Sequence, residues 1–381
     1  MSIPETRQWR RGIFASVVLG IFALLAIVYV TSGRDLASVV RNATLLSLVL
    51  GAAFIVTAWL MRAVRFWLLL RRIGRRARIF SLLQIYLATT FLSHVTPFTT
   101  GGLPLQVYLL SKRHGLTLGE ATAVTGLDSL INTLGVLVLI PLLAVWGSAL
   151  TARPEIRAGL QLLGVLLVGA AGLGAYLLFF RPSWNGEAWL RRQAERLRPG
   201  RTRNAVLKLA GGLGEEWRSF RQALTVYGRL SFVDLVPVVV VTFLYWAAYF
   251  GVALGVLWGM GVFPAWQAVL TSQIVFNVLQ PLAPTPGGSG AAEWGMAVLF
   301  RHLVPREQLA TFVAVWRLFT FYSSLTLGGL SAARLLAPYP ARAGGGGQPE
   351  PLDGYRRPVD VTIEERTGKE RTAEGVEVRH G

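Results

Sequence analysis

Three ionisable residues lie inside long apolar stretches of the sequence: Asp128, Glu293 and Arg317. A charged side chain at the centre of a bilayer costs about 2.5 to 3.5 kcal/mol on insertion scales, so each of them needs a partner or water. A guanidinium can bind a phosphate, while a carboxylate can balance it or bind a headgroup amine or a proton. The three residues therefore indicate either a polar cavity that binds a substrate or a structural ion pair that locks two parts of the chain together.

Polar residues accompany two of these ions at helical spacing. Asn132 lies four residues after Asp128, and Thr320 lies three residues after Arg317. Residues three or four positions apart share one face of a helix. Two polar stripes are therefore predicted to point inward at similar depth.

Two apolar stretches, 79–110 and 265–300, are interrupted by the motifs PFTTGG (97–102) and PTPGG (284–288). Broken backbone at membrane depth frees N–H and C=O groups that only protein or a water-filled cavity can satisfy, although the breaks could also be simple hinges. Glycines would let a headgroup approach the backbone closely. The candidate substrate-binding residues are those of the breaks and the polar residues near them: Pro97, Gly101, Gly102, Gln106, Asp128, Asn132, Pro284, Pro286, Gly287, Gly288, Gly290, Glu293, Arg317 and Thr320.

The composition of the chain is typical of a membrane protein. Of its 381 residues, 53% are hydrophobic and 15% are charged, against about 25% charged in soluble domains. A helix needs about 20 apolar residues to cross the hydrocarbon core of a bilayer. Six uninterrupted stretches meet this length: 13–31, 44–61, 119–148, 158–180, 231–258 and 309–336.

The chain lacks the residues on which several enzyme classes depend. It contains no Cys, and its four His residues fall in no paired metal-ligand spacing. A glycine-rich loop ending in Gly-Lys-Ser or Gly-Lys-Thr, which would hold ATP phosphates, is also missing. We therefore expect no enzyme activity, no catalytic residue, no metal site and no cofactor.

Lys and Arg residues are distributed unevenly between the apolar stretches. Short cytoplasmic segments of membrane proteins hold an excess of basic residues. Suppose that neither 79–110 nor 265–300 crosses the membrane, and that each returns to the side from which it entered. The cytoplasmic side then carries 31 basic residues and the outside carries six. The basic segments are 1–12, 62–78, 111–116, 181–230 and 334–381. This distribution predicts two re-entrant hairpins that enter from opposite faces, with both chain termini in the cytoplasm.

Opposed broken segments in the two halves of a chain are typical of inverted-repeat transporters, whose binding site lies near the bilayer midplane. An ion follows each break at a comparable interval, since Asp128 lies 26 residues after Gly102 and Arg317 lies 29 residues after Gly288. The predicted fold class is all-α integral membrane, with about six transmembrane helices and two opposed re-entrant hairpins in an inverted-repeat arrangement.

Residues 1–336 are predicted to form one polytopic membrane domain. Within it, segment 181–230 is basic, and its apolar residues recur at helical spacing, which suits a cytoplasmic helix lying on the anionic leaflet. The net charge of +18 could also indicate nucleic-acid binding, but the basic clusters adjoin apolar spans, so no nucleic-acid partner is expected. Residues 337–381 hold few large apolar side chains and are predicted to be a disordered cytoplasmic tail.

Three stretches carry a family resemblance: PFTTGGLPLQVYLL (97–110), PTPGGSGAAE (284–293) and WRLFTFYSSLTLGG (316–329). They resemble the flippase-like membrane family that includes the transmembrane part of lysylphosphatidylglycerol synthase, also called multiple peptide resistance factor. The resemblance covers about residues 10–336. It implies a protein that moves a lipid across the cytoplasmic membrane, without the soluble aminoacyl-transferring domain of the synthase.

The expected function is translocation of a phospholipid or polyprenyl-linked lipid between leaflets of the cytoplasmic membrane. In this interpretation Arg317 contacts a phosphate, and Asp128 and Glu293 act as counter-ions or bind an amine or a proton. One alternative is an integral-membrane transferase acting on a lipid-linked substrate, with Glu293 or Asp128 as base. Another is a non-transporting membrane partner of a separate lipid or glycan enzyme.

Overall fold

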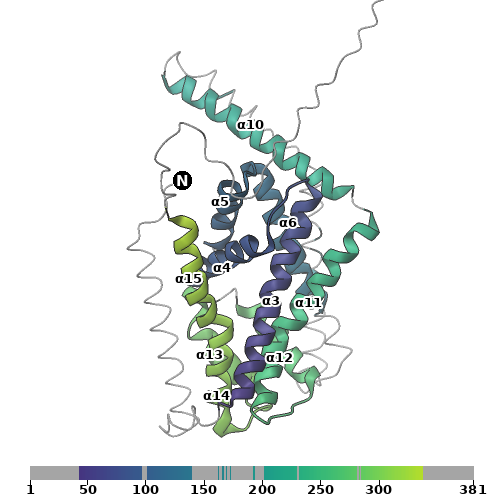
Figure 1. Cartoon of the computed structure of the whole chain (residues 1–381), viewed down its shortest axis with the longest axis vertical. Helices are drawn as coiled ribbons and strands as arrows, with labels where there is room; N and C mark the ends of the chain where they lie inside the picture. Colours follow the sequence, from purple (N-terminus) through teal and green to yellow (C-terminus); the bar gives the residue numbers. More distant parts are fainter. Residues whose placement is uncertain are drawn as a thin grey trace, which may run out of the picture.

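The structure is a computed structural model that describes residues 43–96, 101–139, 201–229, 231–280, 283 and 285–337, with seven isolated positions between 162 and 193. All regular structure in this part of the chain is helical (Figure 1). Several predictions fall outside it: the span 13–31, most of the span 158–180, the end of the span 119–148, the tail from 338, and Pro97 and Pro284.

The helices in chain order are α3 (Leu45–Arg72), α4 (Ile79–Val95), α5 (Gly102–His114), α6 (Leu118–Leu137), α10 (Arg201–Gly228), α11 (Phe232–Gly259), α12 (Trp266–Leu279), the 3₁₀ turn η4 (Pro286–Gly288), α13 (Ala291–Phe300), α14 (Arg306–Arg317), the π-helical turn η5 (Leu318–Tyr322) and α15 (Ser323–Leu336). Helices α3 and α11 are long and apolar enough to cross a membrane.

Helices α3 and α11 lie side by side and form the central pair of the bundle (Figure 1). Each begins at a hydroxyl cap, because the side chains of Thr44 and Ser231 accept hydrogen bonds from backbone N–H groups of the first turn. At the far end of the pair a Cβ on Gly259 would lie 2.2 Å from the Cα of Ser47, so only glycine permits this approach. The prediction of a long apolar helix at 231–258 is confirmed.

The span predicted at 44–61 was too short. Helix α3 continues to Arg72 without a break, so Arg62 and Arg65 lie on a helix and not in a cytoplasmic loop. The helix continues because its polar residues gain partners inside the bundle, which an apolar-length criterion does not detect.

Both interrupted stretches consist of two helices joined at a break, as predicted. Helix α4 ends at Val95 and α5 begins at Gly102, and the turn η4 lies between α12 and α13. The breaks approach each other, since a Cβ on Gly287 would lie 2.9 Å from the carbonyl oxygen of His94 at the end of α4. In Figure 1, α5 lies toward the top of the view and α13 toward the bottom. The orientation of these helix pairs relative to a membrane stays a prediction.

Helix α10 crosses the top of the bundle in Figure 1. The sequence suggested that its apolar face lies on lipid, but Leu224 and Tyr227 in its second half are buried against the protein. The hydroxyl of Tyr227 donates to the carbonyl oxygen of Leu69 over 2.9 Å. Burial, and to a lesser extent Glu120, raises the pKa of Tyr227, so the hydroxyl remains a donor. This part of the apolar face therefore holds α10 to the bundle.

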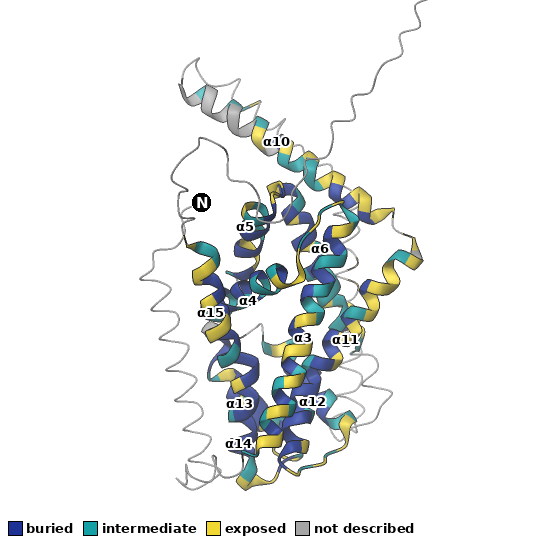
Figure 2. Ribbon diagram, viewed as in Figure 1, coloured by how far each residue is buried: buried dark blue, intermediate teal, exposed yellow. Residues whose placement is uncertain are grey.

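Figure 2 shows exposed residues along α3, α11 and α15. Large apolar residues are among them: Val49 on α3 and Phe243 on α11 are 55% and 65% exposed, and Leu330 on α15 is 59% exposed. Exposed large apolar side chains on several helices are typical of a surface in contact with lipid.

Helix α15 packs on α4 so closely that a Cβ on Gly328 would lie 2.4 Å from the carbonyl oxygen of Leu87. We predict that Gly328→Ala destabilises the protein by about 1–3 kcal/mol, because backbone must move. Gly126→Ala on α6 is the matched control, since nothing lies within 4 Å of its Cβ position. It should be neutral or stabilising by up to about 1 kcal/mol. Thermal unfolding of the detergent-purified protein, followed by circular dichroism, compares the two; equal losses would contradict the close α4–α15 contact.

The chain contains no Cys, so single-cysteine variants can be labelled without background. Lys112 at the end of α5 and His302 after α13 are both exposed. We predict that a cysteine replacing Lys112 reacts with a membrane-impermeant reagent only from the cytoplasmic side, and one replacing His302 only from the outside. Labelling of both from the same side would refute the opposed arrangement of the two breaks.

Candidate functional site

A polar cavity of about 150 Å³ lies where the two breaks meet. Its walls come from the end of α4, from α11, from the end of α12 and the following break, and from the junction of α14 with η5. The lining residues are Ser93, His94, Tyr249, Gln280, Ala283, Gly288, Trp316, Arg317 and Thr320. Both halves of the chain therefore contribute to one cavity, and Arg317, Thr320 and Gly288 are the predicted site residues that line it.

Arg317 is the only Lys, Arg, Asp or Glu among the residues that line this cavity. Its Nε donates to Oε1 of Glu293 over 2.8 Å, and its guanidinium carbon lies 4.2 Å from the centre of the Phe321 ring. The side chains of both ions are at most 2% exposed. Of the two carboxylates expected as counter-ions of Arg317, Glu293 is therefore the one that pairs with it, and one face of the guanidinium is covered by an aromatic ring.

The other oxygen of Glu293 holds the second break in place. Oε2 accepts a hydrogen bond of 2.7 Å from the backbone N–H of Gly290, immediately before α13. An acidic side chain in the first turn also suits the positive end of the helix dipole. Glu293 therefore couples the start of α13 to Arg317 at the end of α14.

Gly287 is required at the tip of the second break for two reasons. Its φ of +61° lies in the left-handed region, and a Cβ there would lie 2.4 Å from the Phe321 ring. The 3₁₀ turn begins at Pro286, whose ring fixes φ and needs no N–H partner. Residues 286–288 thus form a tight turn whose Gly287 lies against Phe321 and the end of α4.

A π-helical turn begins directly after Arg317. Such turns are rare and occur frequently at functional sites, because the extra residue redirects the side chains on either side. Thr320 lies within this turn, with its hydroxyl donating to the carbonyl oxygen of Trp316 over 2.9 Å. No sequence signal for this turn was recognised.

Several buried polar groups on the second helix pair have no hydrogen-bond partner among the described residues. They include the hydroxyls of Ser272, Thr285 and Ser289 and both amide atoms of Gln273. An unsatisfied buried polar group costs about 1–3 kcal/mol, so native proteins satisfy such groups with water or a ligand. We therefore expect water or a polar ligand to bind in this region.

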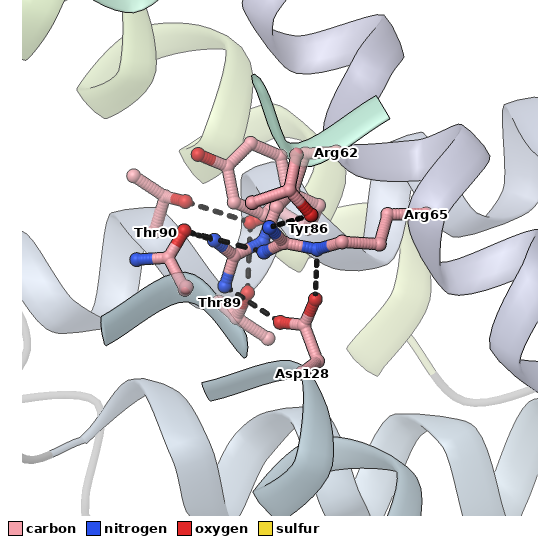
Figure 3. A network of polar contacts seen from close by, with 8 residues as sticks. Arg62, Arg65, Tyr86, Thr89, Thr90 and Asp128 are labelled. Atoms are coloured by element: carbon pink, nitrogen blue, oxygen red, sulfur yellow. Dashed lines mark hydrogen bonds and ion pairs between the residues drawn. The ribbon is translucent and has the colours of Figure 1, made fainter. Parts of the chain in front are cut away.

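Asp128 belongs to a second, separate ion cluster (Figure 3). Its two oxygens accept hydrogen bonds of 2.6 Å from Arg62 and 2.7 Å from Arg65, both on α3. Asn132 Oδ1 accepts from both arginines, and Arg65 also donates to the hydroxyl of Thr242 over 3.2 Å. The cluster thus ties α3 to α6 and α11.

Aromatic rings enclose the second cluster. The centre of the Tyr245 ring lies 5.5 Å from the guanidinium carbon of Arg62 and 5.6 Å from that of Arg65, and Tyr86 lies 5.5 Å from Arg62. Figure 3 shows Tyr86 beside the arginines, with Thr89 and Thr90 donating to its carbonyl oxygen. Rings that face cations in this way stabilise them where water is scarce.

Sequence reasoning missed Arg62 and Arg65, which were counted among the basic residues of a loop. A signal was present, since the two arginines are three positions apart and directly follow the apolar stretch 44–61. The alternative that Asp128 is the counter-ion of Arg317 is wrong, because the carboxylate of Asp128 pairs with Arg62 and Arg65 of α3.

The remaining predicted residues lie near the first break and have mainly structural surroundings. A Cβ on Gly102 would lie 2.0 Å from the Ser93 hydroxyl, so this glycine allows α5 to contact α4. The N–H of Gly101 donates to the Thr96 hydroxyl over 3.0 Å. Gln106 is buried on α5 and is not among the residues that line the cavity.

The carboxylate of the second cluster and its more exposed arginine should respond differently to substitution. Asp128→Asn leaves two buried guanidinium groups without a carboxylate and should destabilise the protein by about 3–5 kcal/mol. Arg62→Gln leaves Asp128 paired with Arg65 and should cost about 1 kcal/mol. Chemical or thermal unfolding in detergent measures the difference, and similar losses for both variants would show that Arg65 alone does not neutralise Asp128.

The comparisons with known proteins agree with this architecture. Residues 13–328 match the family model described as lysylphosphatidylglycerol synthase TM region. The chain is also 26% identical to a "UPF0104 membrane protein" of Archaeoglobus fulgidus over 324 residues, which cover 84% of this chain and 94% of the relative. The matched region contains both breaks and both ion clusters. This chain therefore belongs to the lysylphosphatidylglycerol synthase transmembrane-region family and is an integral membrane protein of flippase-like type.

Proposed function

We propose that the protein translocates a lipid between the leaflets of the cytoplasmic membrane, with the headgroup passing through the cavity between the two breaks. The observation that carries this proposal is a polar cavity containing Arg317 at the meeting point of two interrupted helix pairs. A phospholipid or a polyprenyl-linked lipid would supply the phosphate that a guanidinium binds.

The size of the cavity supports entry by the headgroup alone. Sites for drug-sized ligands usually enclose about 300–1,000 Å³, whereas this cavity encloses about 150 Å³. Acyl chains would stay in the bilayer against the exposed apolar helix faces while the headgroup crosses. The breaks would have to separate alternately toward each side, as in transporters built from inverted repeats.

The proposed membrane orientation places the end of the bundle crossed by α10 in the cytoplasm, together with both chain termini. Arg218 and Arg221 of α10 would then face the anionic leaflet, which attracts basic helices at a membrane surface. Basic residues at the ends of α3 and α5 gather at the same end of the bundle (Figure 1).

The transferase alternative has weaker support from the geometry. A general base must be able to take a proton, but Glu293 and Asp128 are fully buried and already accept hydrogen bonds from arginines. Their oxygens are therefore already occupied by donors from the protein itself. The remaining alternative, a non-transporting partner of a lipid or glycan enzyme, is separated by the transport assay below.

The test is reconstitution into liposomes with labelled phospholipids and, separately, labelled polyprenyl-phosphate glycolipids. We predict faster exchange between leaflets for at least one lipid. Ala283→Phe should abolish the acceleration because the ring fills the cavity, whereas Leu330→Phe on the exposed face of α15 should retain it. If the unmodified chain accelerates the exchange of no lipid, the result favours a non-transporting partner of a lipid or glycan enzyme. Equal activity of the two variants would show that the headgroup does not pass through the cavity.

The Arg317–Glu293 pair allows a second test. Arg317→Ala leaves a buried carboxylate without its partner and should lower both stability and transport. Adding Glu293→Gln should restore stability relative to Arg317→Ala alone, while transport stays lost, because the headgroup contact is not restored. Unfolding and leaflet exchange are measured on the same preparations. A double variant with full transport would show that the pair is only structural.

A further inference from the structure

The two ion clusters differ in charge. Arg317 and Glu293 form a neutral pair, whereas Asp128 is the one carboxylate in the described structure that contacts both Arg62 and Arg65. The second cluster therefore carries one excess positive charge within the apolar bundle. A buried excess charge is costly unless an anion balances it.

Donors at this cluster remain without acceptors in the described part of the chain. Nε of Arg62 is buried and has no hydrogen-bond partner. The same holds for Nε1 of Trp246, a residue only 6% exposed that follows Tyr245 on α11. The Arg62 side chain is 12% exposed, against 1% for Arg65, so Arg62 is the arginine that a ligand can reach.

An apolar groove of about 440 Å³ borders the cluster between α6, α11 and α12. Its walls include Leu134, Phe243, Trp246 and Ile274. Thr242 joins the two features, because it lines the groove and its hydroxyl accepts a hydrogen bond from Arg65. The groove therefore reaches a residue that contacts Arg65, and Arg65 shares Asp128 and Asn132 with Arg62.

We propose that this region binds an anionic glycerophospholipid, with the phosphate diester at Arg62 and one acyl chain in the groove. The anion supplies the missing negative charge and an acceptor for the Arg62 Nε–H. Basic pockets between transmembrane helices are known to hold anionic lipid headgroups. The site is separate from the cavity at Arg317, and its occupation does not depend on whether the protein translocates lipids.

The apolar groove favours a lipid over a free inorganic anion. Inorganic phosphate would neutralise the cluster but leave the groove walls unfilled, whereas burying one methylene group gains about 0.8 kcal/mol. A zwitterionic lipid fills the groove but brings no net negative charge. An anionic lipid is therefore the occupant that satisfies both the charge and the apolar surface.

Native mass spectrometry of the detergent-purified full chain tests this site. The protein is titrated with phosphatidylglycerol and, separately, with phosphatidylcholine of the same chain length. Three variants are compared: Arg62→Gln at the cluster, Ala247→Trp in the groove, and Arg71→Gln on the exposed surface of α3 as the matched control. Inorganic phosphate is added as a competitor in a further series.

We expect the unmodified chain to bind one phosphatidylglycerol more tightly than phosphatidylcholine. Arg62→Gln should weaken that binding by about tenfold or more, as loss of a charge-assisted hydrogen bond implies. Ala247→Trp should weaken it by filling the groove, and it leaves the ion cluster intact if Arg62→Gln does not fold. Arg71→Gln should bind as the unmodified chain does.

Three results would overturn the proposal. Unchanged phosphatidylglycerol binding in Ala247→Trp would exclude the groove, and unchanged binding in folded Arg62→Gln would exclude the cluster. Displacement of the lipid by inorganic phosphate at a similar concentration would identify a simple anion site.

Discussion

A charge buried among apolar helices has to be neutralised where it lies, and this constraint determines how the helices of this protein meet. Asp128 on α6 pairs with two arginines of α3, and the hydroxyl of Thr242 extends the same network to α11. In the other half of the chain, Glu293 at the start of α13 pairs with Arg317 at the end of α14. Removing one partner from such a pair costs more than the pair contributes, so each cluster fixes a helix arrangement.

The breaks in the helices depend on the same ions. A helix interrupted inside an apolar environment leaves backbone groups unsatisfied. Oε2 of Glu293 accepts a hydrogen bond from the N–H of Gly290, while Oε1 accepts one from Arg317. One carboxylate therefore forms the ion pair and satisfies a backbone group at the break. Gly287 then brings the backbone turn against His94 of the first half. The cavity is therefore a consequence of how the charges and the breaks are satisfied together.

The sequence predicted the elements whose signals are local. The interruptions at the Pro and Gly motifs and the long helix α11 follow from composition and spacing within one segment. The sequence also marked Arg317 as a buried ion in need of a counter-ion, but it did not decide between Glu293 and Asp128. The partners of Asp128 could not be found in this way, because Arg62 lies 66 residues away and resembled a positive-inside residue. The packing of Tyr227, on the apolar face of α10, against the bundle was missed for the same reason, since an amphipathic face can lie on protein as well as on lipid.

The neutrality of the Arg317–Glu293 pair constrains which headgroups can occupy the proposed path. A phosphate that takes Arg317 away from Glu293 leaves a carboxylate in a water-poor site, which is costly unless that carboxylate gains another partner. A zwitterionic headgroup supplies both halves of the exchange, since its amine can bind Glu293 while its phosphate binds Arg317. A purely anionic headgroup has to bring a proton or a cation for Glu293. Within the proposed function, the pair therefore selects headgroups by their net charge and not by the phosphate alone.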